Sequence, residues 1–305
     1  MKKLFTEVFP ERIGQFTLVD EHSHRTDIQG SNFARYKNSK GKYAFAKLLR
    51  NSTKPWESHW ITNESEIYPM LNTMKVKGRV SVPHLLASKK TQNGHVLLFE
   101  YIHGKTLRDV KNLSAIKIIN EVLGYMNSIH VGGSVYSKKT VIPKRHNLYF
   151  LCAFPLLLTL TYIKHADLRK QVWSAIKFCV RGLREILFDR DYGFIHRDLN
   201  DTNIIISARH IWLIDFQTSL IADRRFELAN IAINLWDTHR WSNTFFTQPH
   251  VRFILHDSAA FRVFTFFCLF AALYEIVQRK HSVEPWLKSF LLHTINNEHS
   301  EVKSV

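Results

Sequence analysis

Over the first hundred residues, apolar and polar positions follow one another in short runs separated by polar turns. The runs with the length and composition of β-strands are residues 15–19, 32–36, 42–49, 80–86 and 95–101. The polar stretches 37–41 and 88–94 have turn composition and are expected to join neighbouring strands. Residues 63–74 have helical spacing instead, and Pro69 within them predicts a late start or a kink. This part of the chain therefore predicts a small β-rich lobe with one helix.

After position 104, apolar residues recur at the three- and four-residue spacing of helices. The segments concerned are 106–130, 150–187, 228–236, 259–278 and 286–295. A short strand-rich island, residues 193–216, interrupts them. A β-rich part followed by a helical part predicts the α+β class with two lobes, residues 1–103 and 104–305, and a cleft near residues 100–104.

Composition adds that the chain is globular and strongly basic. Apolar residues make up 45% of the 305 positions, too many for a disordered chain. The formal net charge of +16 attracts anionic partners such as ATP, an acidic sugar, a membrane surface or a nucleic acid. The basic residues are scattered along the sequence, so the charge alone does not indicate one binding patch.

Two apolar runs raise the question of a membrane. Residues 147–163 carry no charge, but they include Pro155 and are shorter than the roughly 20 residues of a spanning helix. We interpret them as a buried helix, and residues 263–274 are shorter still. The N-terminus lacks the apolar core of a signal peptide, and the three cysteines are expected to be reduced core thiols. The expected location is the cytoplasm, and peripheral contact with the inner face of the membrane stays open.

Candidate chemistry lies in the strand-rich island. Residues 194–206 read Phe-Ile-His-Arg-Asp-Leu-Asn-Asp-Thr-Asn-Ile-Ile-Ile, and Ile214-Asp215-Phe216 follows the next strand. Two apolar strands thus form a hairpin with the oxygen-bearing side chains of Asp198, Asn203 and Asp215 at its ends. Carboxylate and amide oxygens suit Mg²⁺, and a carboxylate facing an acceptor can take a hydroxyl proton.

These residues resemble the catalytic loop and the metal-binding Asp-Phe-Gly element of kinases. The resemblance implies ATP and Mg²⁺ as cofactors, Asp198 as the catalytic base, Asn203 and Asp215 as metal ligands, and His196 as a structural support. It also implies a lysine in the N-terminal lobe that binds the phosphates of ATP. Lys47 ends the run Tyr-Ala-Phe-Ala-Lys, which resembles the Val-Ala-Ile-Lys strand of kinases.

A glutamate on the following helix should pair with Lys47. Glu66 is the expected partner and Glu64 is the alternative. For the loop that covers the phosphates, residues 28–32 are the candidate, with Gly30 as their single glycine. Residues 97–107 resemble the hinge of aminoglycoside and choline kinase relatives, which implies that backbone groups of Glu100, Tyr101 and Ile102 bind adenine.

Departures from protein kinases favour a small-molecule enzyme. Asn200 and Gln217 stand where protein kinases have Lys and Gly, and no Ala-Pro-Glu element is found. Residues 214–217 and 226–232 resemble those of bacterial aminoglycoside phosphotransferase-like enzymes. The resemblance implies transfer of the ATP γ-phosphoryl group to a hydroxyl of a sugar, an aminoglycoside or a glycoconjugate. An atypical Ser/Thr protein kinase, or a lipopolysaccharide or glycolipid kinase at a membrane surface, is the alternative.

The partner is therefore expected to be a small hydroxyl-bearing acceptor, anionic or sugar-containing, and no nucleic acid partner is expected. The oligomeric state is not predicted. Residues 218–225 and 236–241 either line the acceptor pocket or are ordinary surface and core residues. Arg197 either grips an acidic substrate or pairs with a neighbouring carboxylate, and the second role is favoured.

Overall fold

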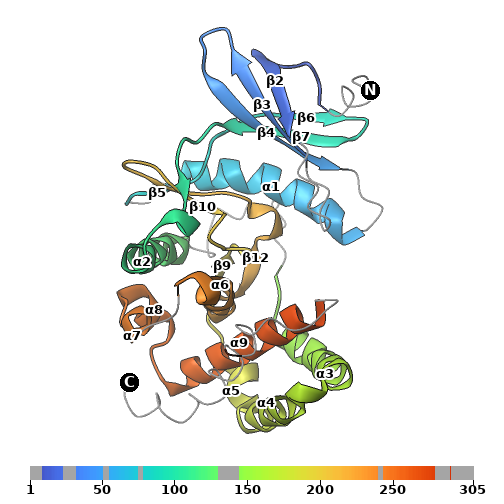
Figure 1. Ribbon diagram of the computed structural model, residues 1–305, viewed down its shortest axis with the longest axis vertical. Helices are drawn as coiled ribbons and strands as arrows, with labels where there is room; N and C mark the ends of the chain where they lie inside the picture. Colours follow the sequence, from blue (N-terminus) through green and yellow to red (C-terminus); the bar gives the residue numbers. More distant parts are fainter. Residues whose placement is uncertain are drawn as a thin grey trace. The chain divides into compact units, whose positions relative to one another are not determined.

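In the computed structural model of the chain (Figure 1), the structure describes residues 9–22, 32–50, 55–74, 78–129, 144–239, 243–278 and 289. The chain divides into two compact units. The first comprises Met1–Lys105 and Ile205–Thr218, and the second comprises Thr106–Ile204 and Ser219–Val305. The segment that contains Asp198 and the segment that contains Asp215 thus fall in different units. The lobe boundary expected at residue 103 stays a prediction.

The first unit contains an antiparallel sheet with the strand order β1-β2-β3-β4-β7-β6. Its strands are β1 (Arg12–Ile13), β2 (Phe16–His22), β3 (Asn32–Asn38), β4 (Tyr43–Arg50), β6 (Leu85–Thr91) and β7 (Gly94–Glu100). The hairpin between β3 and β4 is confirmed, with Lys37 opposite Tyr43. The turn expected at 88–94 is shorter, because Ser88 pairs with Leu97 and β6 continues to Thr91. Alternate side chains of these strands form one core, which includes Tyr36, Ala46, Leu48 and Leu98.

Helix α1 (Pro55–Thr73) lies in the same unit and packs against β6 and the 3₁₀ turn η3 (Phe216–Thr218). The helix begins earlier than its apolar spacing predicts and continues through Pro69. A second sheet has the order β5-β11-β10-β8. Its strands are β5 (Val80–Ser81), β8 (Lys105–Thr106), β10 (Ile204–Ile206) and β11 (Ile211–Leu213).

The second unit is mainly helical, so the α+β class is confirmed. Its helices are η1 (Leu107–Asp109), α2 (Asn112–Ser128), α3 (Asn147–Lys164), η2 (Ala166–Leu168), α4 (Arg169–Arg181), α5 (Leu183–Phe188), α6 (Arg224–His239), α7 (Asn243–Phe246), α8 (Pro249–Ile254) and α9 (Ser258–Gln278). Strands β9 (Tyr192–Ile195) and β12 (Leu220–Asp223) form an antiparallel pair. Packing centres on α9, which contacts α6 and α3 through the rings of Phe226, Phe150 and Phe267. The helix expected at 286–295 lies outside the described residues.

Among the described residues, α3 and α9 are long and apolar enough to cross a membrane by length and composition. They differ in burial, because 72% of the apolar window of α9 lies inside the protein but only 33% of that of α3. Helix α9 is therefore a core helix, whereas the prediction that α3 is buried holds for one face only. Cys179 and Cys268 are buried as expected, but Cys152 on α3 is exposed.

Candidate active site

Lys47 on β4 has two carboxylate partners within the first unit. Its Nζ lies 2.9 Å from Glu64 Oε2 and 2.7 Å from Asp215 Oδ1. The side chain is almost fully buried, and burial lowers the pKa of Lys47. The two carboxylates outweigh this effect, so the net pKa is raised and the ammonium stays charged.

The partner of Lys47 on α1 is Glu64 and not Glu66, which corrects the sequence-based expectation. Glu64 is buried, whereas Glu66 is partly exposed. Two residues along an α-helix turn the side chain by about 200°, so both cannot face the same lysine. Burial raises the pKa of the Glu64 carboxyl, and the Lys47 charge opposes that rise.

Asp215 is held by a residue that the sequence did not single out. Its backbone N–H donates to the Tyr68 hydroxyl at 2.9 Å, and its φ of 67° lies in the left-handed region. The Tyr68 ring packs edge-on against Phe216 and also against Phe99. Tyr68 lies one helical turn after Glu64, so one face of α1 supports both Lys47 and Asp215. The four-residue spacing of Glu64 and Tyr68 is the feature of the sequence that places both on one face of the helix.

In the second unit, the loop after β9 is organised around Asn200. Its Oδ1 accepts hydrogen bonds from the backbone N–H groups of Thr202 and Asn203, and its Nδ2 donates to Asp198 Oδ1 at 3.2 Å. Asn203 Nδ2 donates to the Asp198 carbonyl at 2.7 Å and to Asp198 Oδ2 at 3.3 Å. The departure from Lys at position 200 thus has a structural consequence, because the asparagine orders the loop that carries Asp198.

Helix α6 fixes the residue before Asp198. Arg197 has a φ of 70°, unusual for a residue with a Cβ. Its N–H donates to Glu227 Oε2 at 2.7 Å, and its carbonyl accepts from Asn230 Nδ2 at 3.2 Å. Burial raises the pKa of Glu227 to about 8, although hydrogen bonds from the backbone oppose the rise. Sequence reasoning did not identify Glu227 as a support of this loop.

Carboxylate pairing, the role favoured for Arg197, is not observed. Within the described ranges, no carboxylate forms an ion pair with its guanidinium, and Asp201 is bound bidentately by Arg108 instead. Burial and then the nearby charge of Arg145 lower the pKa of Arg197. The arginine therefore lies beside Asp198 as a partly buried cation.

Each of the expected metal ligands carries a side-chain oxygen of the kind that Mg²⁺ binds. Asn203 donates to the Asp198 carbonyl and carboxylate through Nδ2, and these two hydrogen bonds do not use its Oδ1. Asp215 is partly exposed and uses Oδ1 for Lys47. Within the part of the chain that the structure describes, no group of three His, Cys, Asp or Glu side chains could hold a metal. A hard ion that keeps water and phosphate ligands needs only one or two such protein oxygens.

Of the expected adenine and phosphate residues, Gly30 lies outside the described residues. The Glu100 side chain accepts the His84 N–H at 2.8 Å and is thus occupied structurally. Tyr101 and Ile102 follow β7 as partly buried residues. Gly104 is required here, because a Cβ would lie 2.6 Å from Ile206 O.

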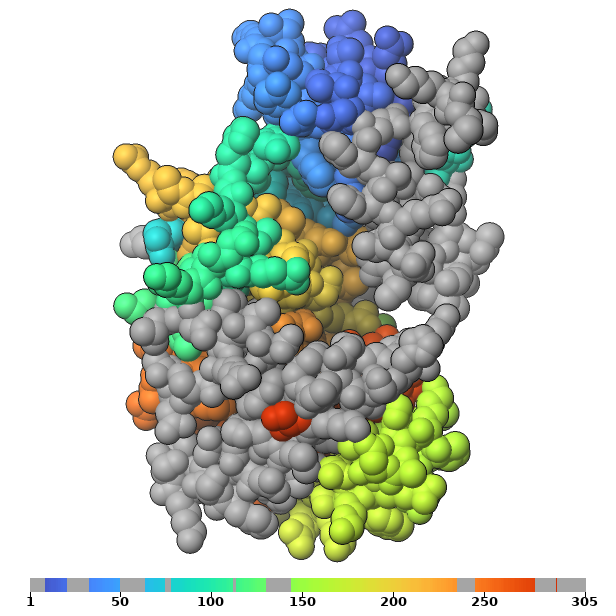
Figure 2. All heavy atoms as spheres, in the orientation of Figure 1, coloured from blue at the N-terminus to red at the C-terminus, as the bar shows by residue number. Residues whose placement is uncertain are grey.

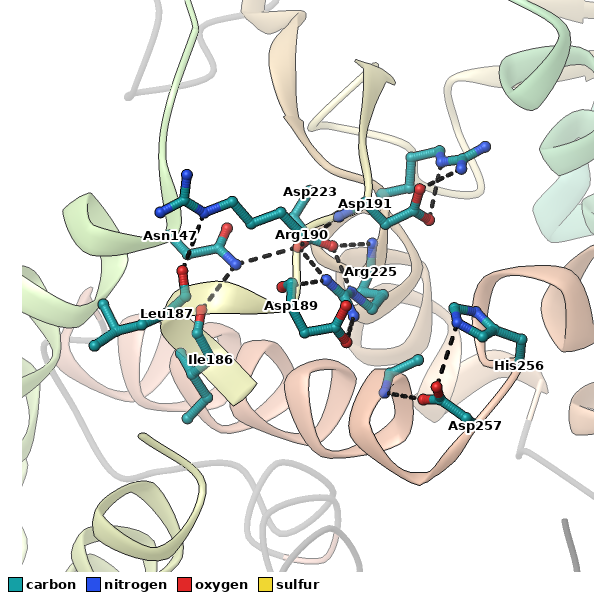
Figure 3. A network of polar contacts seen from close by, with 12 residues as sticks. Asn147, Ile186, Leu187, Asp189, Arg190, Asp191, Asp223, Arg225, His256 and Asp257 are labelled. Carbon is teal, nitrogen blue, oxygen red and sulfur yellow. Dashed lines mark hydrogen bonds and ion pairs between the residues drawn. The ribbon is translucent and has the colours of Figure 1, made fainter. Parts of the chain in front are cut away.

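Asp223 and Arg225, which were considered for the acceptor pocket, are core residues (Figure 3). Arg225 Nη2 lies 2.5 Å from Asp223 Oδ2, and its Nη1 lies 2.6 Å from Asp189 Oδ2. Asn147 Nδ2 also donates to Asp223 Oδ2 at 3.2 Å. These hydrogen bonds and ion pairs connect the first residue of α3 with β12 and α6. The side chains of 236–241 lie outside the described residues.

Comparison with known proteins gives a family and a fold. The sequence matches the phosphotransferase enzyme family over residues 27–261. No curated protein matches. A thermostable form of aminoglycoside phosphotransferase APH(4)-Ia, in a ternary complex with AMP-PNP and hygromycin B, is similar with a TM-score of 0.63 and 13% identity, over 93% of this chain and 96% of that one.

Two further structures have the same fold. The GDP complex of aminoglycoside 2′-phosphotransferase IIIa has a TM-score of 0.62 and 14% identity, over 93% of both chains. A protein from Haemophilus somnus 129PT assigned as a fructosamine-3-kinase has a TM-score of 0.58 and 11% identity, over 93% of this chain and 92% of that one. The family match covers well over half of the sequence. The chain is thus a kinase-type enzyme acting on hydroxyl groups, and it belongs to the phosphotransferase enzyme family.

Proposed function

We propose that this protein transfers the γ-phosphoryl group of ATP to a hydroxyl of a small molecule, namely a sugar, an aminoglycoside or a glycoconjugate. The observation that carries the proposal is the buried Lys47, whose ammonium is shared between Glu64 and Asp215. A buried lysine that keeps its charge is suited to binding phosphate oxygens, and its two carboxylates hold it in place. The location proposed for this activity is the cytoplasm.

In this mechanism, Lys47 binds the phosphates and the backbone from Glu100 to Ile102 binds adenine. Asn203 and Asp215 would hold Mg²⁺, and the ion would neutralise phosphate charge. Asp198 accepts the proton of the acceptor hydroxyl, and the order that Asn200 imposes on its loop is the structural support for this role. The lobes for nucleotide and acceptor are proposed as residues 1–103 and 104–305.

The test is turnover with a panel of acceptors. The full chain is incubated with Mg²⁺ and ATP plus individual sugars and aminoglycosides, and ADP release is recorded. Acceptor-dependent release is expected, and Asp198→Asn should lower kcat by at least about a hundredfold, the size of a general-base contribution. Asp109→Asn changes an exposed aspartate of the same unit and should retain activity.

The proposal fails if no acceptor stimulates ADP release and the protein also binds no nucleotide. Phosphorylation of the chain itself or of a basic protein, with no small acceptor used, would favour the protein kinase alternative. Thermal melting of each variant establishes that a loss of activity is not a loss of fold.

A further inference from the structure

Helix α3 has large apolar residues on its exposed side as well as on its buried side. Between its first residue and Lys164 it contains no charged side chain. Phe150, Phe154 and Leu157 face the core of the second unit. The opposite side exposes 58% of Leu148, 62% of Leu156 and 68% of Ile163. A surface helix of a soluble domain normally carries polar residues on that side, so this face is built for contact with something apolar.

We define the α3 face by its exposed apolar and cysteine residues, among which Thr159 is also exposed. They are Leu148, Tyr149, Cys152, Leu156, Tyr162 and Ile163. The atoms of α3 and α4 are the lime-green ones in Figure 2, and they lie on the visible surface at the lower right.

Cations over aromatic rings mark both ends of the α3 face. The guanidinium of Arg145 lies 4.6 Å from the centre of the Tyr149 ring at the start of the helix. At the other end, the guanidinium of Arg169 lies 4.9 Å from the centre of the Tyr162 ring. Tyrosine and arginine at the borders of an apolar surface are typical of the zone where lipid chains meet headgroups.

The segment that contains this face is strongly basic. Residues 144–184 carry eight Lys and Arg side chains against one acidic residue, Asp167. These 41 positions thus supply a net +7 of the +16 of the whole chain. Helix α4, which packs against α3, adds exposed Lys170, Lys177 and Trp173.

We propose that the α3 face, with the cations at its ends and on α4, docks on the surface of an anionic phospholipid bilayer. The apolar side chains enter the border between headgroups and acyl chains, and Lys and Arg contact the phosphates. A second copy of this chain is disfavoured as the occupant, because apposing two such faces would bring like charges together. The docking does not depend on the acceptor being a lipid.

The first test is co-sedimentation of the full chain with vesicles, without nucleotide. Vesicles of phosphatidylcholine are compared with vesicles in which phosphatidylglycerol replaces part of it. Binding is expected to the anionic vesicles alone and should weaken as salt is raised. Leu156→Glu with Ile163→Glu should weaken binding by at least about tenfold, since both side chains would leave the lipid. Lys170→Glu with Lys177→Glu should weaken it by about fivefold or more for each cation lost.

Matched controls change similar residues outside the face. Phe253→Glu alters a helical side chain of the same unit that is 58% exposed, and Lys117→Glu alters an exposed lysine on α2. Both should bind vesicles like the natural protein, and circular dichroism should show all variants folded. The proposal is overturned if the natural chain does not bind anionic vesicles, or if the α3 and control variants bind equally. It is also overturned if light scattering finds a dimer that the α3 substitutions dissociate.

Cys152 offers a second, independent measurement. It is the exposed one of the three cysteines and lies on the α3 face, so an environment-sensitive fluorophore can be attached to it selectively. Its emission should shift to the blue with anionic vesicles. The same label at position 253, placed by Phe253→Cys with Cys152→Ser, should not shift. An unchanged spectrum at Cys152 would contradict insertion of this face even if the protein sediments.

Discussion

At the scale of single residues, the first unit keeps the buried Lys47 charged. An ammonium buried without a partner would lose its proton, or its side chain would turn outward into water. Lys47 avoids both because Glu64 and Asp215 contact it directly. Asp215 is in turn fixed by Tyr68 from the helix that carries Glu64. The three charged side chains are therefore positioned by one helix and one strand.

Glu64 and Glu66 should differ sharply when each is neutralised. Glu64→Gln leaves Lys47 with Asp215 alone, which pulls the ammonium away from the position that phosphate needs. A misplacement of about 1 Å costs on the order of a hundredfold, so kcat/KM for ATP should fall by that factor. Glu66→Gln should leave kcat/KM unchanged, because Glu66 does not contact Lys47. Steady-state kinetics with varied ATP measure both, and equal losses would contradict the pairing.

A second expectation at this scale concerns Glu227 and pH. Its pKa in the folded protein is raised to about 8 by burial, from 4.5 for the ordinary side chain. As pH rises between these values, the unfolded chain releases a proton that the folded chain keeps, so unfolding becomes more favourable. The stability that the protonated Glu227 contributes is fully present below the pKa of the unfolded chain. It is lost as pH rises through the pKa of the folded protein. The free energy of unfolding should thus fall by up to about 1.4 kcal/mol per pH unit in that window.

Glu227→Gln is the reference for this measurement, since an amide does not titrate but can still accept the Arg197 N–H. Urea unfolding of both proteins at several pH values gives the difference in free energy. A difference that does not change with pH would contradict the raised pKa. Glu227→Ala removes the acceptor as well and should lower kcat, because Arg197 then loses a contact that holds it beside Asp198.

At the scale of elements, a buried network of charged side chains connects several helices and a strand of the second unit. Arg225 is fully buried and forms ion pairs with Asp223 and Asp189. Asn147, the first residue of α3, donates a hydrogen bond to the Asp223 carboxylate. Adjacent Arg224 pairs with Asp191, also in this region, but remains partly exposed. The ends of four elements, α3, α5, β12 and α6, are therefore held by a few charged side chains.

Arg225→Met should be strongly destabilising, because it leaves the Asp223 carboxylate buried without its cation. The expected loss is about 3–5 kcal/mol in the free energy of unfolding. Arg224→Met removes a pair that is partly exposed to water and should cost about 1 kcal/mol. Urea unfolding measures both, and equal losses in the two adjacent arginine variants would show that the burial of Arg225 is not decisive.

At the scale of the whole molecule, the two units each contain part of the proposed chemistry. Lys47, Glu64 and Asp215 belong to the first unit, and Asp198 and Asn203 belong to the second. Each set is ordered by contacts inside its own unit. A nucleotide that binds the folded chain and not the unfolded one is expected to stabilise the fold.

AMP-PNP with Mg²⁺ should raise the melting temperature of the full chain. At a ligand concentration of about 100 Kd the gain corresponds to roughly 2.7 kcal/mol. Lys47→Met should abolish the shift, whereas Lys42→Met, an exposed residue just before β4, should keep it. Thermal melting with and without Mg²⁺ measures the effect, and a full shift in Lys47→Met would contradict its role in binding nucleotide.

Much of this arrangement was predictable from the chain alone. The alternation of apolar residues predicted the strands that carry Lys47, and helical spacing predicted the second unit. The choice between Glu64 and Glu66 was not predictable, because it depends on the rotation of α1 against β4. Tyr68 and Glu227 were missed since each acts on a backbone group far away in sequence, at residues 215 and 197.

By itself, then, the sequence determined the α+β class, and it predicts Lys47, Asp198, Asn203 and Asp215 as site residues, because chemistry of this kind depends on residue type at a given spacing. Only the tertiary structure decided which glutamate meets Lys47, that Arg225 is a core residue, and that α3 exposes an apolar face. Periodicity reports that a helix is apolar, but which side is covered depends on the helices packed against it. In α3 that side is the one facing α9, and the other side is left for a membrane surface in our proposal.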